Sequence, residues 1–522
     1  MFHTVLRPLL WVLFLALAGC AVLPSKVERT PSAAFQDTGD TPIGRMVSPL
    51  TEAHPGESGA YLLFSAREAF AARWALATRA ERSLDVQYYI WHADVSGSLM
   101  ANALRQAAAR GVRVRVLLDD ANTSGLDENI AAIAASPNIE VRLFNPFANR
   151  TWHTGDFLRD FSRVNRRMHN KSFTADNQVT VVGGRNIGDE YLGAQSPVAF
   201  TDLDMMVIGR VVGEVSTAFD AYWNSASAYP AASLLATPSA VALAEIEGKW
   251  ALQRARPAAA EYLDAARKLD LLRQIRTATL PLAWGPARVL SDDPGKVLQS
   301  LGRRHTGLQG QLRERFMPQR ELLLVSPYFV PGPGGADMLA DLAQRGVRVS
   351  VLTNSLAATD VPATYAGYLR YRDKLLRAGV HLYELKPSPQ APAIAGSTED
   401  RGLGPPGSTG GSSTASLHAK TFVMDRSRVF VGSYNLDPRS ATLNTEMGVV
   451  MDSQELAASL ADTFTVHIER DAYEVRLEDD GQVVWIEPTA DGEVRHTSTP
   501  GSRGLRGLWI DLLRLLPIES LL

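Results

Sequence analysis

The 522-residue chain has little of several features that define common protein classes. With one cysteine, Cys20, it cannot form an internal disulfide. Its 53 basic and 56 acidic residues give a net charge of −3, so there is no global field to attract nucleic acid, which we do not expect as a partner. No metal-ligand spacing is present, and we expect neither a metal nor another cofactor. With 45% hydrophobic residues, the chain should be a globular protein of two or three domains.

The only long apolar run is too short to span a membrane as a mature helix. Residues 9–18 read LLWVLFLALA, which is typical of a signal peptide. They lead into LAGC at 17–20, which resembles the bacterial lipobox, whose cysteine is acylated and becomes the new N-terminus. The resemblance implies a signal peptide at 1–19, membrane attachment through acylated Cys20 and, because Ala21 follows, the periplasmic face of the outer membrane. The alternatives are an uncleaved anchor or a plain secretory signal.

Beyond this leader, the pattern changes from a polar segment to alternating strands and helices. Residues 20–58 are rich in Pro, Ser, Thr and Gly, which predicts a flexible lipidated tether. A strand is then predicted over 84–91, a helix over 99–108 and a strand over 112–118. A strand, a helix and a strand joined by short turns favour a parallel sheet covered by helices.

This unit occurs twice. RGVRVRVL at 110–117 is nearly repeated as RGVRVSVL at 345–352, each after a helical pattern and a strand. We infer an internal duplication, with chance similarity between α/β units as the alternative. The predicted fold is α/β, with two duplicated domains, each a mixed or parallel sheet flanked by helices, and an active site at their interface. The expected parts are a first domain at 59–225, a helical connector at 226–280, a second domain at 281–475 and a C-terminal extension with an amphipathic tail at 476–522.

The same polar string occurs in both halves with identical spacing. A histidine is followed by a lysine, an aspartate, a glycine pair or Gly-Ser, and an asparagine. Apolar β-prone residues between them predict a hairpin, with the histidine and lysine on one face of a strand. The members are His169, Lys171, Asp176, Gly183, Gly184 and Asn186 in the first half, and His418, Lys420, Asp425, Gly432, Ser433 and Asn435 in the second.

Two imidazoles, two ammonium groups and two amides suit the cleavage of a phosphodiester. The lysines, Asn186, Asn435 and Ser433 would bind the non-bridging oxygens as charge accumulates on them. One imidazole would be neutral and attack phosphorus, while the other would be protonated and supply a proton to the leaving oxygen. The expected intermediate is a phosphohistidine, opened by water or by an alcohol.

The duplicated HxKx4Dx6G(G/S)xN string resembles the signature of the phospholipase D superfamily. Its surroundings at 167–209 and 417–450 are similar to bacterial cardiolipin synthases, especially their C-type branch. The resemblance implies that His169 is the nucleophile and His418 the general acid. Asp176 and Asp425 belong to the catalytic signature, and we expect them to brace the hairpins rather than contact substrate.

The family also uses an acidic residue downstream of each histidine to orient the imidazole. Glu446 fits this role after His418, and Asp202 or Asp204 fits it after His169, with Asp202 preferred.

The resemblance implies a phosphatidyltransferase that makes cardiolipin, with phosphatidylglycerol as a substrate and, in the C-type branch, phosphatidylethanolamine as the donor. Two other functions stay open. One is a phospholipase D-type hydrolase or other phosphodiesterase, including a nuclease. The other is a non-catalytic lipid-binding lipoprotein of the bacterial envelope.

Overall fold

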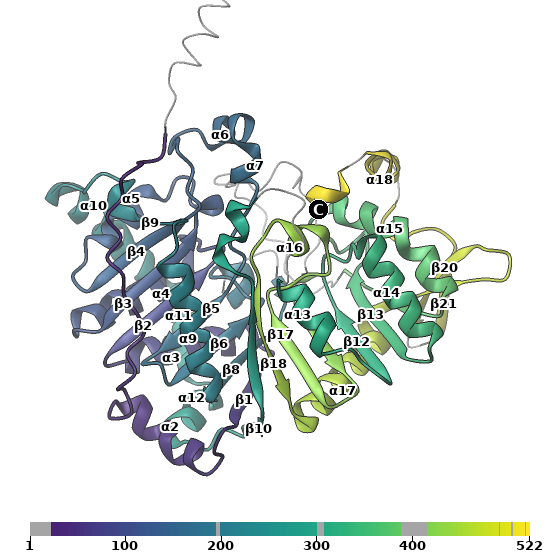
Figure 1. Ribbon diagram of the computed structural model, residues 1–522, viewed down its shortest axis with the longest axis horizontal. Coiled ribbons are helices and arrows are strands. Elements are labelled where there is room, and N and C mark those ends of the chain that lie inside the picture. The colour runs from purple at the N-terminus through teal and green to yellow at the C-terminus, as the bar shows by residue number, and fades with distance from the viewer. Residues whose placement is uncertain are drawn as a thin grey trace, which may run out of the picture.

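The computed structural model describes residues 22–194, 199–299, 307–387, 415–489, 491–502, 505–516 and 518–522. The expected signal peptide at 1–19 and the lipidation residue Cys20 lie outside these residues. The described chain forms two α/β units side by side, each built on its own large sheet (Figure 1). None of the described helices combines the length and the apolar composition needed to cross a bilayer.

The sheet of the first unit has nine strands. Strands β2, β3 and β4 run parallel because helical crossovers connect them, while the other pairings are antiparallel. In sheet order, the strands are β10 (Ala283–Gly285), β1 (Ser58–Leu63), β8 (Asp204–Gly209), β6 (Val179–Gly183), β5 (Ser172–Ala175), β2 (Ser83–Tyr88), β3 (Arg113–Asp119), β4 (Ile139–Phe144) and β9 (Ala228–Pro230).

The sheet of the second unit has the same strand order as the part of the first sheet from β1 to β9, with β11 in the place of β1 and β19 in the place of β9. Two further strands, β20 and β21, extend the second sheet beyond β19. The predicted duplication is therefore confirmed in the topology. In sheet order, the strands are β11 (Ala287–Ser291), β18 (Met447–Asp452), β17 (Arg428–Gly432), β16 (Thr421–Met424), β12 (Glu321–Val325), β13 (Arg348–Asn354), β14 (His381–Leu385), β19 (Ala472–Leu477), β20 (Val483–Thr489) and β21 (Gly492–His496).

Helices cover the outer faces of both sheets and form the connections between strands (Figure 1). In the first unit they are α2 (Pro42–Glu52), α3 (Ala66–Arg79), α4 (Val95–Ala109), α5 (Asp127–Ala134), α6 (His153–Arg159), α7 (Phe161–Val164), α8 (Asp189–Leu192) and α9 (Arg210–Trp223), followed by α10 (Ala240–Arg254), α11 (Pro257–Arg267) and α12 (Asp270–Thr277). In the second they are α13 (Leu308–Arg315), α14 (Gly332–Gln344), α15 (Pro362–Arg377), α16 (Pro438–Thr442), α17 (Gln454–Asp471) and α18 (Leu505–Leu515).

A hydrophobic core joins the two units into one body. It contains inward-facing side chains from β1, β6 and β8 of one sheet and from β17 and β18 of the other. A small two-stranded sheet also crosses between the units, because β7 (Ala199–Thr201) pairs in parallel with β15 (Ala415–Leu417). The core residues from these strands are Ala60, Leu62, Val182, Met205, Val207, Val429, Val431, Met447, Val449 and Met451.

The predicted tether is wrong over its described part, residues 22–58. Thr41 caps α2 by accepting the N–H of Gly44, and Ile43 and Val47 on this helix are buried in the first core. Earlier in the segment, the Arg29 guanidinium donates to the carbonyl of Ala228 at 2.9 Å. A few apolar and basic residues thus attach this segment to the first unit, although its average composition is polar.

The expected connector and C-terminal extension also belong to the two units. Helices α10–α12 are helical as predicted, and α11 and α12 contribute Tyr262, Leu271 and Ile275 to the first core. Strands β20 and β21 continue the second sheet beyond the predicted end of that domain at residue 475. The amphipathic tail forms α18, which buries Ile510 and Leu513 in the second core.

The two motif aspartates sit at the tips of matching hairpins. Asp176 and Asp425 have positive φ values of 50° and 55°, and the next residues, Asn177 and Arg426, have 51° and 50°. Positive φ at both central residues is the type I′ turn that suits a twisted hairpin. Each carboxylate accepts three successive backbone N–H groups, those of residues 81–83 for Asp176 and 319–321 for Asp425.

Replacing Asp425 by alanine should lower the free energy of unfolding by about 2 kcal/mol, because three N–H groups lose a charged acceptor. Urea unfolding of the two proteins at pH 7 would measure this. Asp452→Ala is the matched control: its carboxylate contacts Arg428 at the surface, and its loss should cost less than about 1 kcal/mol.

This effect should depend on pH. Partial burial opposes ionisation, but the backbone N–H groups outweigh it and lower the pKa of Asp425. Its stabilisation is therefore complete above the ordinary aspartate pKa of about 4 and is lost as the pH falls through the lower folded value. A difference between wild type and Asp425→Ala that stays constant through the acid range would contradict the assignment.

Candidate active site

The two motifs meet between the units because each is hydrogen-bonded to the other half of the chain. The backbone N–H of His169 donates to the carbonyl of Thr445 at 2.9 Å. The backbone N–H of His418 donates to the carbonyl of Thr201 at 2.8 Å, which continues the pairing of β15 with β7. Each histidine therefore lies beside the residues that carry the acidic group of the opposite half.

Each imidazole binds a carboxylate of the opposite half through Nδ1. His169 Nδ1 lies 2.9 Å from Glu446 Oε2, and His418 Nδ1 lies 2.6 Å from Asp202 Oδ2. The sequence order led us to pair Glu446 with His418 and Asp202 with His169, and that pairing is wrong. Because the backbone of each histidine is hydrogen-bonded to the other unit, each imidazole meets the acid of that unit instead. With Nδ1 bound, Nε2 is the ring atom directed away from the carboxylate.

Asp204, the alternative orienting acid, has a different partner. Its carboxylate Oδ2 lies 2.9 Å from Nη2 of Arg73, and both side chains are buried. Asp204 begins β8, where pairing with β6 directs its carboxylate toward Arg73 on α3 rather than toward either histidine. The prediction of Asp204 as an orienting acid is therefore wrong.

The second position of the glycine motif lies against these acids and differs between the halves. At Gly184, a Cβ atom would lie 2.2 Å from Asp202 Oδ1, so a side chain would collide with the carboxylate. At the matching Ser433, the hydroxyl donates to Glu446 Oε2 and accepts the N–H of Met447 at 3.1 Å. The expected phosphate-binding role of Ser433 is wrong, because its hydroxyl is bound to Glu446.

The two motif lysines are buried, and each donates to the carbonyl of its own histidine. Lys171 Nζ lies 2.6 Å from His169 O, and Lys420 Nζ donates to His418 O. Burial lowers the pKa of Lys171 to about 7, with further repulsion from Lys420, and lowers that of Lys420 to about 8. Both lysines come directly before β5 and β16 rather than lying on a strand, so the expected placement of each histidine and lysine on one face of a strand is wrong.

Burial also governs the protonation of the imidazoles. Together with repulsion from Lys171 and Lys420, it holds the pKa of His169 well below its ordinary value. The pKa of His418 is lowered to about 3, with burial and Lys420 outweighing Asp202. Both rings are therefore neutral near pH 7, although we expected one of them to be protonated. A phosphodiester would add negative charge and favour protonation.

The two orienting acids differ in their ionisation. Burial raises the pKa of Glu446 to about 7, against the attraction of Lys171. Burial would also raise the pKa of Asp202, but His418, Lys420 and Arg185 outweigh it and the pKa is lowered. Asp202 is therefore ionised beside His418, whereas Glu446 titrates near neutral pH beside His169.

The motif asparagines are buried at the same edge. The Asn186 carboxamide oxygen accepts the N–H of Ile90 at 3.1 Å, which fixes its orientation. The Asn435 carboxamide oxygen has no hydrogen-bond partner among the described residues. This oxygen can only accept a hydrogen bond, so the amide N–H groups of Asn435 are the atoms that could donate to a phosphate oxygen.

Three further residues line the site, of which the sequence indicated only Tyr89, as an aromatic residue at the end of a predicted strand. The ring of Tyr89 meets His169 edge-on at 5.1 Å between centroids, and that of Tyr191 meets His418 at 5.2 Å. Arg439 lies close enough to His169 to lower its pKa. The two tyrosines do not occupy matching positions relative to the two motifs, so a comparison of the two halves could not identify them. Arg439 stands alone as a base shortly after the second motif.

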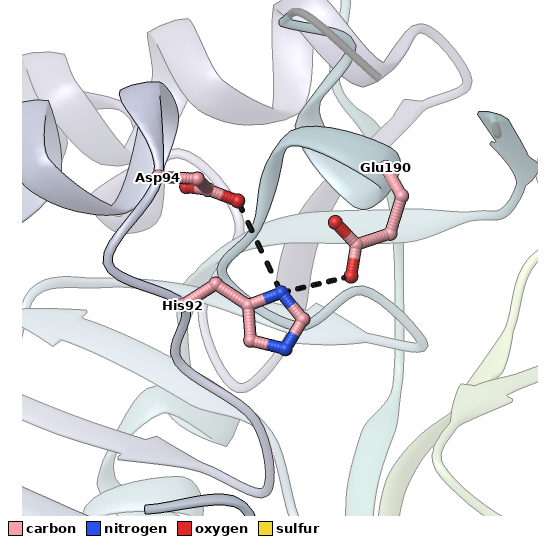
Figure 2. Close-up of side chains that lie close together, drawn as sticks. All are labelled: His92, Asp94 and Glu190. Atoms are coloured by element: carbon pink, nitrogen blue, oxygen red, sulfur yellow. Dashed lines mark ion pairs between the residues drawn. The ribbon is translucent and has the colours of Figure 1, made fainter. Parts of the chain in front are cut away.

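Away from the motifs, one cluster has the composition of a metal site. His92, Asp94 and Glu190 have potential ligand atoms within 4.8 Å of one another (Figure 2). His92 Nδ1 lies 3.1 Å from Glu190 Oε1, while Asp94 accepts the N–H groups of Gly97 and Asp189 at 2.9 and 2.7 Å. Because both Asp94 oxygens serve as acceptors for the backbone around α4 and α8, we assign no metal to this cluster.

Comparison with known proteins is consistent with this arrangement. The family model described as "Cardiolipin synthase, PLD-like domain" matches residues 75–223 and again 315–468. Cardiolipin synthase C of Escherichia coli (strain K12) is 44% identical over 488 residues, which cover 92% of this chain and 99% of that protein. Cardiolipin synthase B of Shigella flexneri is 24% identical, with 79% and 81% covered.

Among solved structures, the phosphatidylserine synthase of Haemophilus influenzae Rd KW20 superposes with a TM-score of 0.52 at 16% identity. The match covers 82% of this chain and 92% of that one. This similarity shows a shared fold.

The lysine pKa values predict how the site binds an oxyanion. Tungstate stays doubly charged between pH 6 and 9, so only the protein titrates. As the pH rises through about 7 and about 8, Lys171 and Lys420 lose their protons and Glu446 becomes negatively charged, so the Kd should rise by up to about tenfold per pH unit for each of these groups. Calorimetric titration would measure this. Lys171→Met should reduce the slope of log Kd against pH by the part that is due to one lysine. A Kd that does not change with pH would contradict the prediction.

Proposed function

The chain belongs to the cardiolipin synthase family of phospholipase D-like proteins, and from this premise we propose that it is a phosphatidyltransferase that makes cardiolipin from phospholipids. One observation carries the proposal: each motif histidine is hydrogen-bonded to the carboxylate of the other half. Each histidine is also close enough to the other half's lysine for that lysine to lower its pKa. Two imidazoles and two ammonium groups around one phosphorus suit transfer through a covalent intermediate.

In the proposed first step, Nε2 of His169 attacks the phosphorus of the donor lipid. A P–N bond forms while the P–O bond to the headgroup breaks, and protonated His418 gives its proton to the leaving oxygen. In the second step, neutral His418 takes the proton from a hydroxyl of phosphatidylglycerol. The freed oxygen attacks phosphorus, the P–N bond breaks and cardiolipin leaves. Lys171, Lys420 and Asn435 would stabilise the charge on the non-bridging oxygens.

The difference between the two acids supports this division of roles. Ionised Asp202 stabilises a positive charge on His418, as a general acid requires. Glu446 titrates near pH 7 and is shared with the hydroxyls of Ser433 and Ser440, so it stabilises such a charge on His169 less strongly. A neutral imidazole is the form that can attack phosphorus.

The finer proposals concern the lipids and the location. Phosphatidylethanolamine is proposed as the donor and phosphatidylglycerol as the acceptor, as the C-type resemblance implies. The protein is further proposed to be a lipoprotein, processed from a signal peptide and acylated at Cys20. It would then work at the periplasmic face of the outer membrane, next to its substrates.

Purified protein should convert vesicles of phosphatidylethanolamine and phosphatidylglycerol into cardiolipin, with release of ethanolamine. His169→Ala should lower the rate by at least about 10³-fold, because no nucleophile remains. His381→Ala, which removes an exposed histidine of β14, is the matched control and should retain full activity. Mass spectrometry of the lipids would decide. Phosphatidic acid in place of cardiolipin would support the hydrolytic alternative and contradict transfer.

The histidine roles can be separated with a phosphatidyl ester of p-nitrophenol, whose leaving group needs no proton. His418→Asn should release about one equivalent of p-nitrophenolate per protein in a rapid burst and then stop, because the acceptor is not activated. His169→Asn should give no burst. Stopped-flow absorbance would measure both, and a burst in His169→Asn alone would exchange the roles.

A further inference from the structure

Exposed apolar side chains gather on two elements of the structure. The first patch consists of Trp152, Leu158 and Phe161, on and just before α6 and α7. Of these, Leu158 is 79% exposed. The second patch consists of residues 508, 509, 512, 515 and 516 on and after α18, where Leu515 is 82% exposed. Within the described ranges, more than half of the exposed large apolar residues lie in these patches or in the adjoining Leu521.

Helix α18 is apolar on both of its faces. Ile510 and Leu513 pack into the second core, where α18 contacts α15. The second patch occupies the opposite face at helical spacing and is exposed to solvent. One face of the helix therefore anchors it to the protein, while the other presents a continuous apolar surface. Such a surface is a sign of an interaction partner.

The two patches are connected through one residue that follows the second motif. Helices α6, α7, α16 and α18 all lie along the upper edge of the molecule in Figure 1. Arg439 on α16 connects them: its guanidinium donates to Asn165, just after α7, at 2.7 Å, and its backbone N–H donates to the carbonyl of Leu522, beyond α18, at 2.7 Å. The carbonyl of Arg439 also accepts the N–H of Asn444 at 2.8 Å, and the carbonyl of the next residue, Thr445, accepts the N–H of His169, so this junction lies close to the first motif.

The composition of the patches fits a lipid interface. Trp152 and Trp509 are 55% and 51% exposed, and tryptophan is enriched where hydrocarbon meets headgroups. Exposed bases lie beside both patches, at Arg159 and Arg514. The described chain also begins at this edge (Figure 1, dark purple), and its first residue, Val22, is two residues after the proposed acylation site.

We infer that the two patches together form a docking surface for a lipid bilayer, which holds this edge of the molecule against the headgroups of its substrates. The inference rests on the proposed function. The occupant is a bilayer rather than another protein, because the surface surrounds a site whose proposed substrates are all carried by the membrane. Each unit contributes one patch, so the bilayer would meet both halves of the site at once.

Contact can be measured without turnover. Leu515→Cys and the control Val466→Cys, an exposed residue of α17 that belongs to neither patch, would be labelled with an environment-sensitive dye in the full chain. Cys20 is common to both and sets the same background. Vesicles of phosphatidylglycerol and phosphatidylethanolamine with brominated acyl chains should quench the dye at 515 by about twofold or more and leave that at 466 unchanged.

No quenching at 515, or equal quenching at both positions, would overturn the proposal. A dye signal that changes with protein concentration in the absence of vesicles would also overturn it, because a second copy of the chain would then cover the patch.

Turnover gives the second test. Leu158→Glu combined with Leu515→Glu places a charge in each patch at the two most exposed positions, so folding should be preserved. On vesicles, kcat/KM should fall at least about tenfold, while on dihexanoyl lipids dissolved as monomers it should stay within about twofold. Val466→Glu combined with Val494→Glu adds the same charge elsewhere and should change neither rate.

Equal losses on vesicles and on dissolved lipids would overturn docking, because the patches would then serve the site itself. If the unchanged chain acts on neither lipid form, the proposed function fails, and the quenching experiment still decides whether the surface binds a bilayer.

Discussion

Each motif imidazole is oriented by a carboxylate that belongs to the other half of the chain. The hydrogen bonds from His169 to Glu446 and from His418 to Asp202 can form only when the two units are packed together. The interface core, the β7–β15 pairing and the contact at Thr445 all serve to bring these atoms into register. Within either unit alone, the histidine has no orienting acid, because the acid of that unit binds the other histidine. The site therefore lies in the interface, and the contacts that hold the two units together also orient the reacting groups.

Burial sets the electrostatics of this interface. Two lysines and two carboxylates lie out of contact with water, where each charge interacts far more strongly than at the surface. Burial lowers the pKa of the lysines and imidazoles and raises that of Glu446, so the resting site holds little net charge. An anionic phosphodiester changes this balance by favouring every protonated cation around it. Substrate binding and protonation of the site are therefore coupled.

Much of this arrangement was predictable from the sequence, and the errors have physical causes. Two identical motif spacings predicted the duplication, and the sheet order repeats it. The strands predicted from aromatic runs end early: β2 ends at Tyr88, where the chain turns into the site. The spacing of the motifs does not show that each histidine binds an acid of the other half, so the acids were paired with the wrong histidines. The segment before residue 58 was misread because composition averages hide the few residues, such as Ile43 and Val47, that anchor it.

The hydroxyl of Ser433 is one of the differences between the two halves of a repeated pocket. Gly184 leaves space that the Asp202 carboxylate fills, whereas Ser433 binds Glu446 directly. In a perfectly symmetric dimer of two such halves, the two histidines would be equivalent and could exchange roles. Fusion of the halves into one polypeptide allows each copy to mutate separately, so each histidine can acquire surroundings of its own.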